Sequence, residues 1–113
     1  MHEMALCEGL LQVLEEQASE QAYRRVRAVW LEVGALAGVD VRALRFAFDV
    51  VCRGTLAEGA ALHIDQRPAP AWCMQCARQI TVNTLLDPCP DCGGGQVQVL
   101  GGDQMRITEL EVD

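Results

Sequence analysis

The sequence contains no lysine, few aromatic residues and no long apolar run. Its nine basic residues are all arginine, and sixteen acidic residues give it a formal charge of −7. A negatively charged chain with only five aromatic residues lacks both the basic surface and the stacking platform of a nucleic-acid-binding protein. No stretch has the roughly 18 apolar residues of a membrane span, and none has the pattern of a signal peptide. We therefore expect a cytoplasmic protein with neither nucleic-acid nor membrane partners.

Six cysteines in a cytosolic chain favour metal or redox chemistry over a disulfide framework. Four of them form two C-x2-C pairs, Cys73 with Cys76 and Cys89 with Cys92, separated by twelve residues. Two such pairs at the ends of a hairpin can place four thiolates around one ion. Because a closed set of four thiolates leaves no open coordination position, we expect structural Zn(II). A redox iron, as in rubredoxin, is the alternative for this ligand set.

The periodicity of apolar residues predicts a small α+β fold. Apolar residues recur at helical spacing over 4–21 and again over 41–53, where Asp40 is the expected N-cap of the second helix. Alternating patterns predict three strands, at 26–33, around Leu62 and Ile64, and at 105–112. The predicted domains are a two-helix, three-strand domain, 1–70 plus 101–113, and an inserted four-cysteine hairpin, 71–100.

Four side chains have no role that the motifs alone assign. Cys7 and Cys52 fall within the predicted helices, where a cysteine usually packs as a small buried apolar residue. The strand pattern places Trp30 on the face opposite Val29 and Leu31, which makes it either partly buried under a loop or an exposed contact for a partner. We interpret His63 as an ordinary strand residue, with metal ligation as the alternative.

The amino terminus combines three potential ligands. An imidazole at His2 can bind a metal ion together with the terminal amine and the His2 backbone nitrogen, which is a nickel or copper geometry. Glu3 can add its own amide nitrogen or a carboxylate oxygen. Because such a site must lose protons to bind, acidification should release the metal.

Several local motifs are distributed along the chain. They are Met1-His2-Glu3, Leu31-Glu32-Val33-Gly34, Ala43-Leu44-Arg45-Phe46-Ala47-Phe48, Arg53-Gly54-Thr55-Leu56-Ala57-Glu58-Gly59-Ala60, the two C-x2-C pairs and the closing strand. In these segments, and over essentially its whole length, the chain resembles the hydrogenase maturation nickel chaperones of the HypA/HybF family. These motifs are specific in combination, although C-x2-C pairs alone occur in many zinc ribbons.

The resemblance implies a nickel metallochaperone and not an enzyme. It assigns nickel, as transient cargo, to Met1, His2 and Glu3, and structural zinc to Cys73, Cys76, Cys89 and Cys92. It also implies two partners, a HypB-like GTPase that delivers nickel and the large subunit of a NiFe-hydrogenase. A homodimer is compatible with the sequence.

A competing hypothesis is a zinc-ribbon module that binds proteins or nucleic acid, in which the amino-terminal histidine is incidental. The net negative charge argues against the nucleic-acid version of this hypothesis. The chain shows no nucleophile paired with a base, no phosphate-binding loop and no open metal site, so the residues by themselves do not predict an enzyme.

Overall fold

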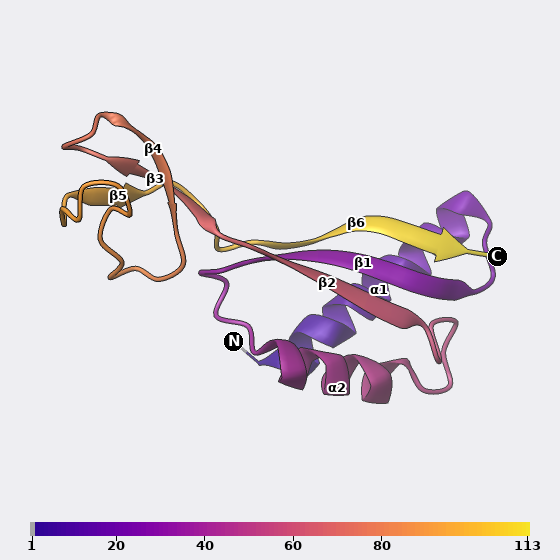
Figure 1. Cartoon of the computed structure of the whole chain (residues 1–113). Coiled ribbons are helices and arrows are strands. Elements are labelled where there is room, and N and C mark those ends of the chain that lie inside the picture. The colour runs from indigo at the N-terminus through magenta and orange to yellow at the C-terminus, as the bar shows by residue number, and fades with distance from the viewer. Residues whose placement is uncertain (1) are drawn as a thin grey trace. The chain divides into compact units, whose positions relative to one another are not determined.

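The computed structural model describes residues 2–113, which form two helices and six strands. In chain order they are α1 (Glu3–Gln21), β1 (Val26–Gly34), α2 (Val41–Cys52), β2 (Ala61–Arg67), β3 (Ala69–Cys73), β4 (Arg78–Val82), β5 (Val97–Val99) and β6 (Met105–Val112) (Figure 1). The strands make two three-stranded sheets, ordered β2-β1-β6 and β4-β3-β5. The predicted α+β fold with a four-cysteine hairpin is confirmed, and β5 extends that hairpin to a sheet.

Local capping groups define the ends of the helices. The Asp40 side chain accepts hydrogen bonds from the backbone N–H groups of Arg42 and Ala43, at 3.0 and 3.2 Å, which confirms the predicted N-cap of α2. Helix α1 ends at Gln21 and is followed by its C-cap residue Ala22, which adopts the left-handed conformation with φ 58°.

Among residues 2–113, neither helix has the length and apolar character needed to span a membrane.

The chain divides into two compact units. The first, here called the helical unit, comprises the residues up to Leu31 together with Val39–Ile64 and Ile107–Asp113. The second, here called the cysteine unit, comprises Glu32–Gly38 and Asp65–Arg106. The division into the domains predicted from the sequence stays a prediction.

The helical unit buries apolar side chains from both helices and from β1. Helices α1 and α2 pack against each other beside the sheet (Figure 1). Among the fully buried side chains are Leu14 of α1, Val29 and Leu31 of β1, and Leu44 of α2. The helical and alternating patterns read from the sequence therefore place these residues in one core.

The cysteine unit has a core of small side chains. Strand β3 is central and pairs antiparallel with β4 and with β5, so that Ala71 lies opposite both Ile80 and Val99. The buried residues of this core are Ala69, Ala71, Cys73, Ile80, Val82 and Cys89. Two of these six are cysteines of the C-x2-C pairs, so the metal centre forms part of the core.

Two glycines let backbone segments of the cysteine unit approach each other closely. A Cβ atom on Gly34 would lie 2.2 Å from the carbonyl oxygen of Gly102, and one on Gly102 would lie 2.4 Å from the Cβ of Ala69. The same Gly102 carbonyl accepts a hydrogen bond of 2.8 Å from the backbone N–H of Leu36. Only glycine fits at either position, and Gly102 also has a positive φ of 89°.

Candidate metal centre

The first knuckle follows directly from strand β3, which ends at Cys73. The Cys73 sulfur accepts a hydrogen bond of 3.3 Å from the backbone N–H of Cys76, and the Cys73 carbonyl accepts one of 2.9 Å from Ala77. Ala77 has a positive φ of 52°, which turns the chain back into β4. The backbone therefore directs both thiols of the pair to the same side of the turn.

The second knuckle repeats this construction. The Cys89 sulfur accepts a hydrogen bond of 3.4 Å from the backbone N–H of Asp91, and the Cys89 carbonyl accepts one of 2.8 Å from Gly93. Gly93 occupies the place of Ala77 and has a φ of 72°. The amide N–H of Asp91 thus turns toward the Cys89 sulfur.

The four sulfurs converge on one point. All of them lie within 4.8 Å of one another, and the pairs Cys73–Cys92 and Cys76–Cys89 are 3.7 and 3.9 Å apart. A tetrahedral ion with metal–sulfur bonds of about 2.3 Å requires sulfurs roughly 3.8 Å apart. The four cysteines predicted as ligands therefore make a metal-binding site. Its dimensions fit an ion with four sulfur ligands in tetrahedral geometry.

The hydrogen bonds among the thiols distribute protons unevenly. The backbone N–H of Cys76 lowers the pKa of Cys73 to about 7, with smaller help from the neighbouring thiols and with desolvation opposing it. The thiols of Cys92 and Cys73 raise the pKa of Cys76 to about 12. Because a second thiolate is disfavoured beside the first, four thiolates can coexist only around a cation.

Two features that support this centre were not predicted from the sequence. The Gln75 side chain lies against the site, where its carbonyl oxygen accepts a contact of 3.6 Å from the Cys92 thiol. A Cβ on Gly94 would lie 1.5 Å from the same Gln75 oxygen. The only sequence signal of this packing was the glycine run after Cys92. The two residues between the cysteines of a C-x2-C pair can be of many types, so Gln75 did not stand out.

The loop between the two knuckles is ordered by one carboxylate. Asp87 accepts hydrogen bonds from the backbone N–H groups of Asn83 and Thr84 and from the Thr84 hydroxyl, at 2.8, 3.1 and 2.6 Å. These bonds, the Thr84 hydroxyl first, lower the pKa of Asp87. The turn exposes Leu85 and Leu86 and leads directly into Pro88 and the second knuckle.

Two of the three predicted nickel ligands, His2 and Glu3, lie at the start of α1. His2 is the N-cap residue, and its carbonyl accepts the first helical hydrogen bond, from Leu6 at 3.1 Å. Glu3 opens the helix, and its carboxylate accepts a hydrogen bond of 3.3 Å from the backbone N–H of Asp40. Met1, the third predicted nickel ligand, lies outside the described residues. The fold thus brings Glu3 to the start of α2, a contact that the sequence did not predict.

The structure gives packing roles to the side chains that the motifs left without one. Cys7 and Cys52 are 0% and 1% exposed, which confirms that both pack in the core. Trp30 is half-buried, and its ring stacks on the His63 ring of the neighbouring strand β2. In residues 2–113, the only clustered set of three or more potential metal ligands is that of the four cysteines.

The fold and the cysteine centre define a small α+β metal-binding protein. The model of the family described as "Hydrogenase/urease nickel incorporation, metallochaperone, hypA" matches residues 1–112. The chain belongs to this HypA family, which is a family of metallochaperones and not of enzymes.

Full-length relatives agree with this assignment, and a solved structure shares the fold. The chain is 59% identical to the hydrogenase maturation factor HypA of Alkalilimnicola ehrlichii and 52% identical to that of Rhodopseudomonas palustris strain TIE-1, over all 113 residues of each protein. The fold matches the solution structure of the Ni metallochaperone HypA from Helicobacter pylori with a TM-score of 0.70 and 24% identity, covering 99% of this chain and 97% of that one. The predicted family is therefore confirmed.

Proposed function

We propose that this protein binds Ni(II) at its amino terminus and helps to insert the ion into the large subunit of a NiFe-hydrogenase. The observation that carries the proposal is the exposed His2 at the start of α1, in a chain whose residues 1–112 match the family. The curated relatives named above are hydrogenase maturation factors, which supports a hydrogenase as the recipient.

The start of α1 suits a nitrogen-rich nickel site. The first backbone N–H groups of a helix, here those of His2 and Glu3, have no partner within the helix. The terminal amine of Met1, the His2 backbone nitrogen and the His2 imidazole would begin the square-planar set that Ni(II) favours. The Glu3 carboxylate already accepts a hydrogen bond from Asp40, so Glu3 would more readily contribute its backbone nitrogen.

We propose structural Zn(II) for Cys73, Cys76, Cys89 and Cys92. The closed four-sulfur set favours zinc because it offers no position for a substrate or water. Bound zinc would hold the two knuckles together and would complete the small core of the cysteine unit. A purified protein that is colourless and contains one zinc would support this assignment, whereas visible iron–thiolate absorption would contradict it.

The remaining parts of the proposal concern partners, location and domains. A HypB-like GTPase would deliver nickel to the amino terminus, and the hydrogenase large subunit would receive it. We place this exchange in the cytoplasm, where the six unpaired cysteines would stay reduced. The four-cysteine domain, 71–100, would fold on its metal, and the rest of the chain would form the nickel-binding domain, with a homodimer as a further possibility.

Calorimetric titration with Ni(II) tests the terminal site. We would compare zinc-loaded protein bearing its native amino terminus with His2→Ala and with a chain extended by one residue before Met1. Loss of nickel binding in both variants, with zinc content and circular dichroism unchanged, is the expected result. Equal binding in all three proteins would place the nickel elsewhere and would overturn the terminal site.

A further inference from the structure

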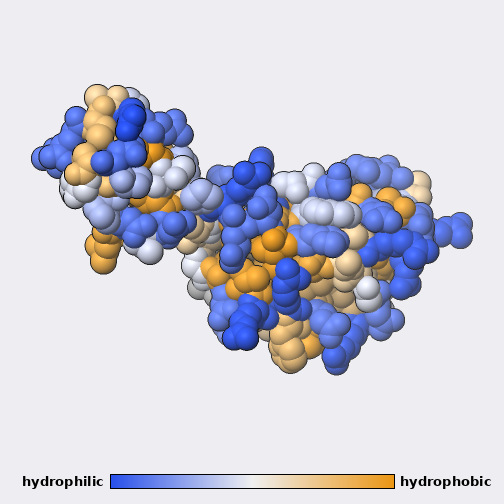
Figure 2. All heavy atoms as spheres, viewed as in Figure 1, coloured by the Kyte–Doolittle hydropathy of each residue, from blue (hydrophilic) through white to orange (hydrophobic). Residues whose placement is uncertain are grey.

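The four cysteines of the metal centre differ in their exposure to solvent. Cys73 and Cys89 are 0% and 1% exposed, Cys76 is half-buried, and Cys92 is the one exposed member of the set. Hydrophilic residues cover much of the surface that the cysteine unit shows in Figure 2, so water surrounds this part of the molecule. The attraction between opposite charges is weaker next to water than in a protein interior. Cys92 is therefore the ligand that would leave a bound ion most readily.

One side chain of the first knuckle lies against this exposed cysteine of the second. The Gln75 Oε1 atom and the Cys92 sulfur are 3.6 Å apart, which is a hydrogen-bond distance for the large sulfur atom. The Met74 backbone N–H donates a hydrogen bond of 2.9 Å to the Gln96 carbonyl, so the backbone joins the first knuckle to the chain that follows the second. The backbone thus keeps Gln75 within reach of Cys92.

The chain leaves room for the Gln75 amide at Gly94. A Cβ atom on Gly94 would lie 1.5 Å from Oε1 and 2.7 Å from Cδ of Gln75. The backbone N–H of Gly94 also forms a hydrogen bond with the Cys92 sulfur. A larger residue at this position would push the amide away, so Gly94 and Gln75 together cover the exposed ligand.

The polarity of the contact depends on whether Cys92 is a thiol or a thiolate. A thiol donates its S–H to the amide oxygen, whereas a metal-bound cysteine is a thiolate that can only accept hydrogen bonds. Glutamine carries an oxygen acceptor and an NH2 donor on one planar group, and a half-turn about the last side-chain bond exchanges them. The turned Gln75 amide would bring a donor to the negatively charged sulfur. Hydrogen bonds to a charged acceptor are stronger than those between neutral groups.

We propose that Gln75 is a positioning residue of the zinc centre. Its side-chain NH2 group donates a hydrogen bond to the Cys92 thiolate, offsets part of the negative charge of this ligand and keeps it on the ion. Gln75 acts through Cys92 and is not itself a ligand. The inference rests on the proposed zinc assignment, because the bound ion is what keeps Cys92 a thiolate.

Zinc transfer to a competing chelator, measured on the full-length, zinc-loaded protein, tests the proposal. Gln75→Met keeps an unbranched side chain of similar length but removes its N–H donors. It should release zinc about tenfold faster than the wild type, because partners of metal ligands typically contribute that much to affinity. Gly94→Ala should also release zinc faster, since its methyl group would displace the Gln75 amide.

A second glutamine of the cysteine unit provides a matched control. Gln98 of β5 lies opposite Trp72 of β3, and the next residue of β3 is Cys73. Because successive residues of a strand point to opposite faces, Gln98 is on the face of the sheet that Cys73 does not occupy. Gln98→Met should therefore release zinc at the wild-type rate.

Cobalt substitution supplies a readout that packing alone would not change. Co(II) in place of zinc gives a sulfur-to-metal charge-transfer absorption, whose energy falls when a thiolate loses a hydrogen bond. This absorption should move to longer wavelength in Gln75→Met and Gly94→Ala and stay unchanged in Gln98→Met. If Gln75 only fills the space beside Gly94, Gln75→Met will match the wild type in both absorption and zinc release, and the proposal is overturned.

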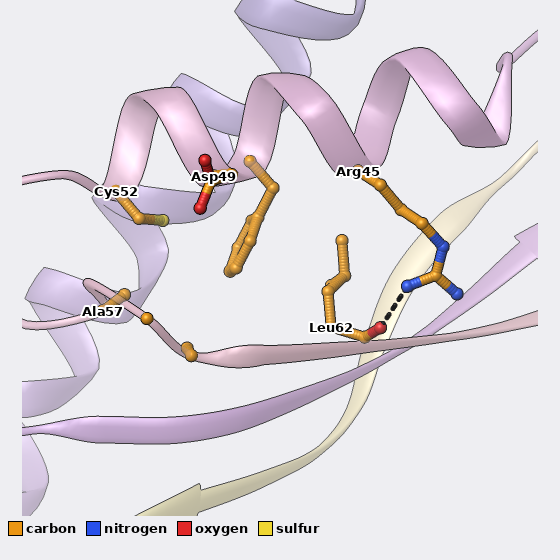
Figure 3. Close-up of a pocket in the computed structure, with 8 residues that line it drawn as sticks. Arg45, Asp49, Cys52, Ala57 and Leu62 are labelled. Atoms are coloured by element: carbon orange, nitrogen blue, oxygen red, sulfur yellow. Dashed lines mark hydrogen bonds between the residues drawn. The ribbon is translucent and has the colours of Figure 1, made fainter.

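Alkylation with iodoacetamide, mapped by mass spectrometry, identifies the ligand that is released. In zinc-loaded Gln75→Met, Cys92 should be modified first and faster than in the wild type. Faster modification of Cys76 with Cys92 unchanged would overturn the proposal. Cys52 is 1% exposed and lies at the wall of a cavity beside α2 (Figure 3), so it serves as an internal reference. Its modification rate should be the same in every variant, because the helical unit is unchanged.

The outcomes distinguish this inference from the zinc assignment on which it rests. If the wild-type protein holds no zinc and gives no cobalt–thiolate absorption, the zinc assignment fails and the role of Gln75 fails with it. If the wild type holds one zinc and both Gln75→Met and Gly94→Ala behave like it, the zinc site stands and the role of Gln75 is overturned.

Discussion

Trp30 and His63 lie face to face on neighbouring strands, with ring centroids 4.6 Å apart and planes inclined by 19°. This stack covers an indole that would otherwise be exposed on the sheet surface. The His63 ring is occupied by this stack, which favours a structural role for His63 over nickel ligation.

Removing the imidazole should therefore change the environment of Trp30 and leave nickel binding intact. In a Trp72→Phe background, His63→Ala should shift the Trp30 fluorescence maximum to longer wavelength, because water replaces the ring. We expect a stability loss of roughly 0.5–1.5 kcal/mol, typical of an aromatic pair. Nickel affinity measured by calorimetry should stay at the wild-type value, and a large loss would show that His63 is a ligand.

Metal removal should unfold the cysteine unit before the helical unit. The core of the cysteine unit consists largely of alanines and cysteines, which bury little apolar surface. Metal binding, with a free energy of about 10 kcal/mol or more, would supply the stabilisation that this small core cannot provide. Chelation under reducing conditions should erase the amide NMR signals of β3, β4 and β5 while those of α1 and α2 persist. Cys89→Ser should have the same effect without chelator, and Cys52→Ala should retain the metal. Simultaneous loss of all signals would contradict the proposed domain division.

Alkaline conditions should destabilise the helical unit through its two buried thiols. Burial, together with the nearby charge of Glu3, raises the pKa of Cys7 from 9.0 to about 11. Burial also raises the pKa of Cys52 from 9.0 to about 11, with further contributions from Cys7 and Asp49. The folded state thus keeps both thiols neutral after the unfolded chain has begun to ionise. The contribution of the two neutral thiols to the free energy of unfolding is therefore fully present below pH 9 and is lost as the pH rises to 11.

Thermal melts of metal-loaded protein at pH 8 to 11 would measure this loss as a fall of several degrees in the melting temperature. Replacing both thiols in Cys7→Ala/Cys52→Ala should lower stability at pH 8 but flatten the decline above pH 9. An equally steep decline in this variant would assign the pH dependence to other groups.

Two glycine-to-alanine substitutions should have opposite effects on stability. Gly34→Ala would place a methyl group 2.2 Å from the backbone oxygen of Gly102 and should cost about 2 kcal/mol or more. Gly9→Ala lies within α1, where nothing stands within 4 Å of the new methyl, and should add up to about 1 kcal/mol. Urea unfolding of both variants checks the pair, and a neutral Gly34→Ala would contradict the close approach.

The sequence by itself determined the two helices, the strands β1, β2 and β6, and the four cysteines of the metal centre. Helical periodicity located α1 and α2, and Asp40 marked the start of α2, because a capping side chain acts within three residues of itself. The two C-x2-C pairs likewise identify their own turns, since each knuckle is formed by five consecutive residues. The motifs distributed along the chain identified the family for the same reason: each is a local pattern.

Only the tertiary structure decided which distant residues meet. The stack of Trp30 on His63, the contact of Glu3 with Asp40 and the fit of Gly34 against Gly102 each join residues more than thirty positions apart. No local pattern encodes such contacts, because they depend on strand order and on the packing of one element against another.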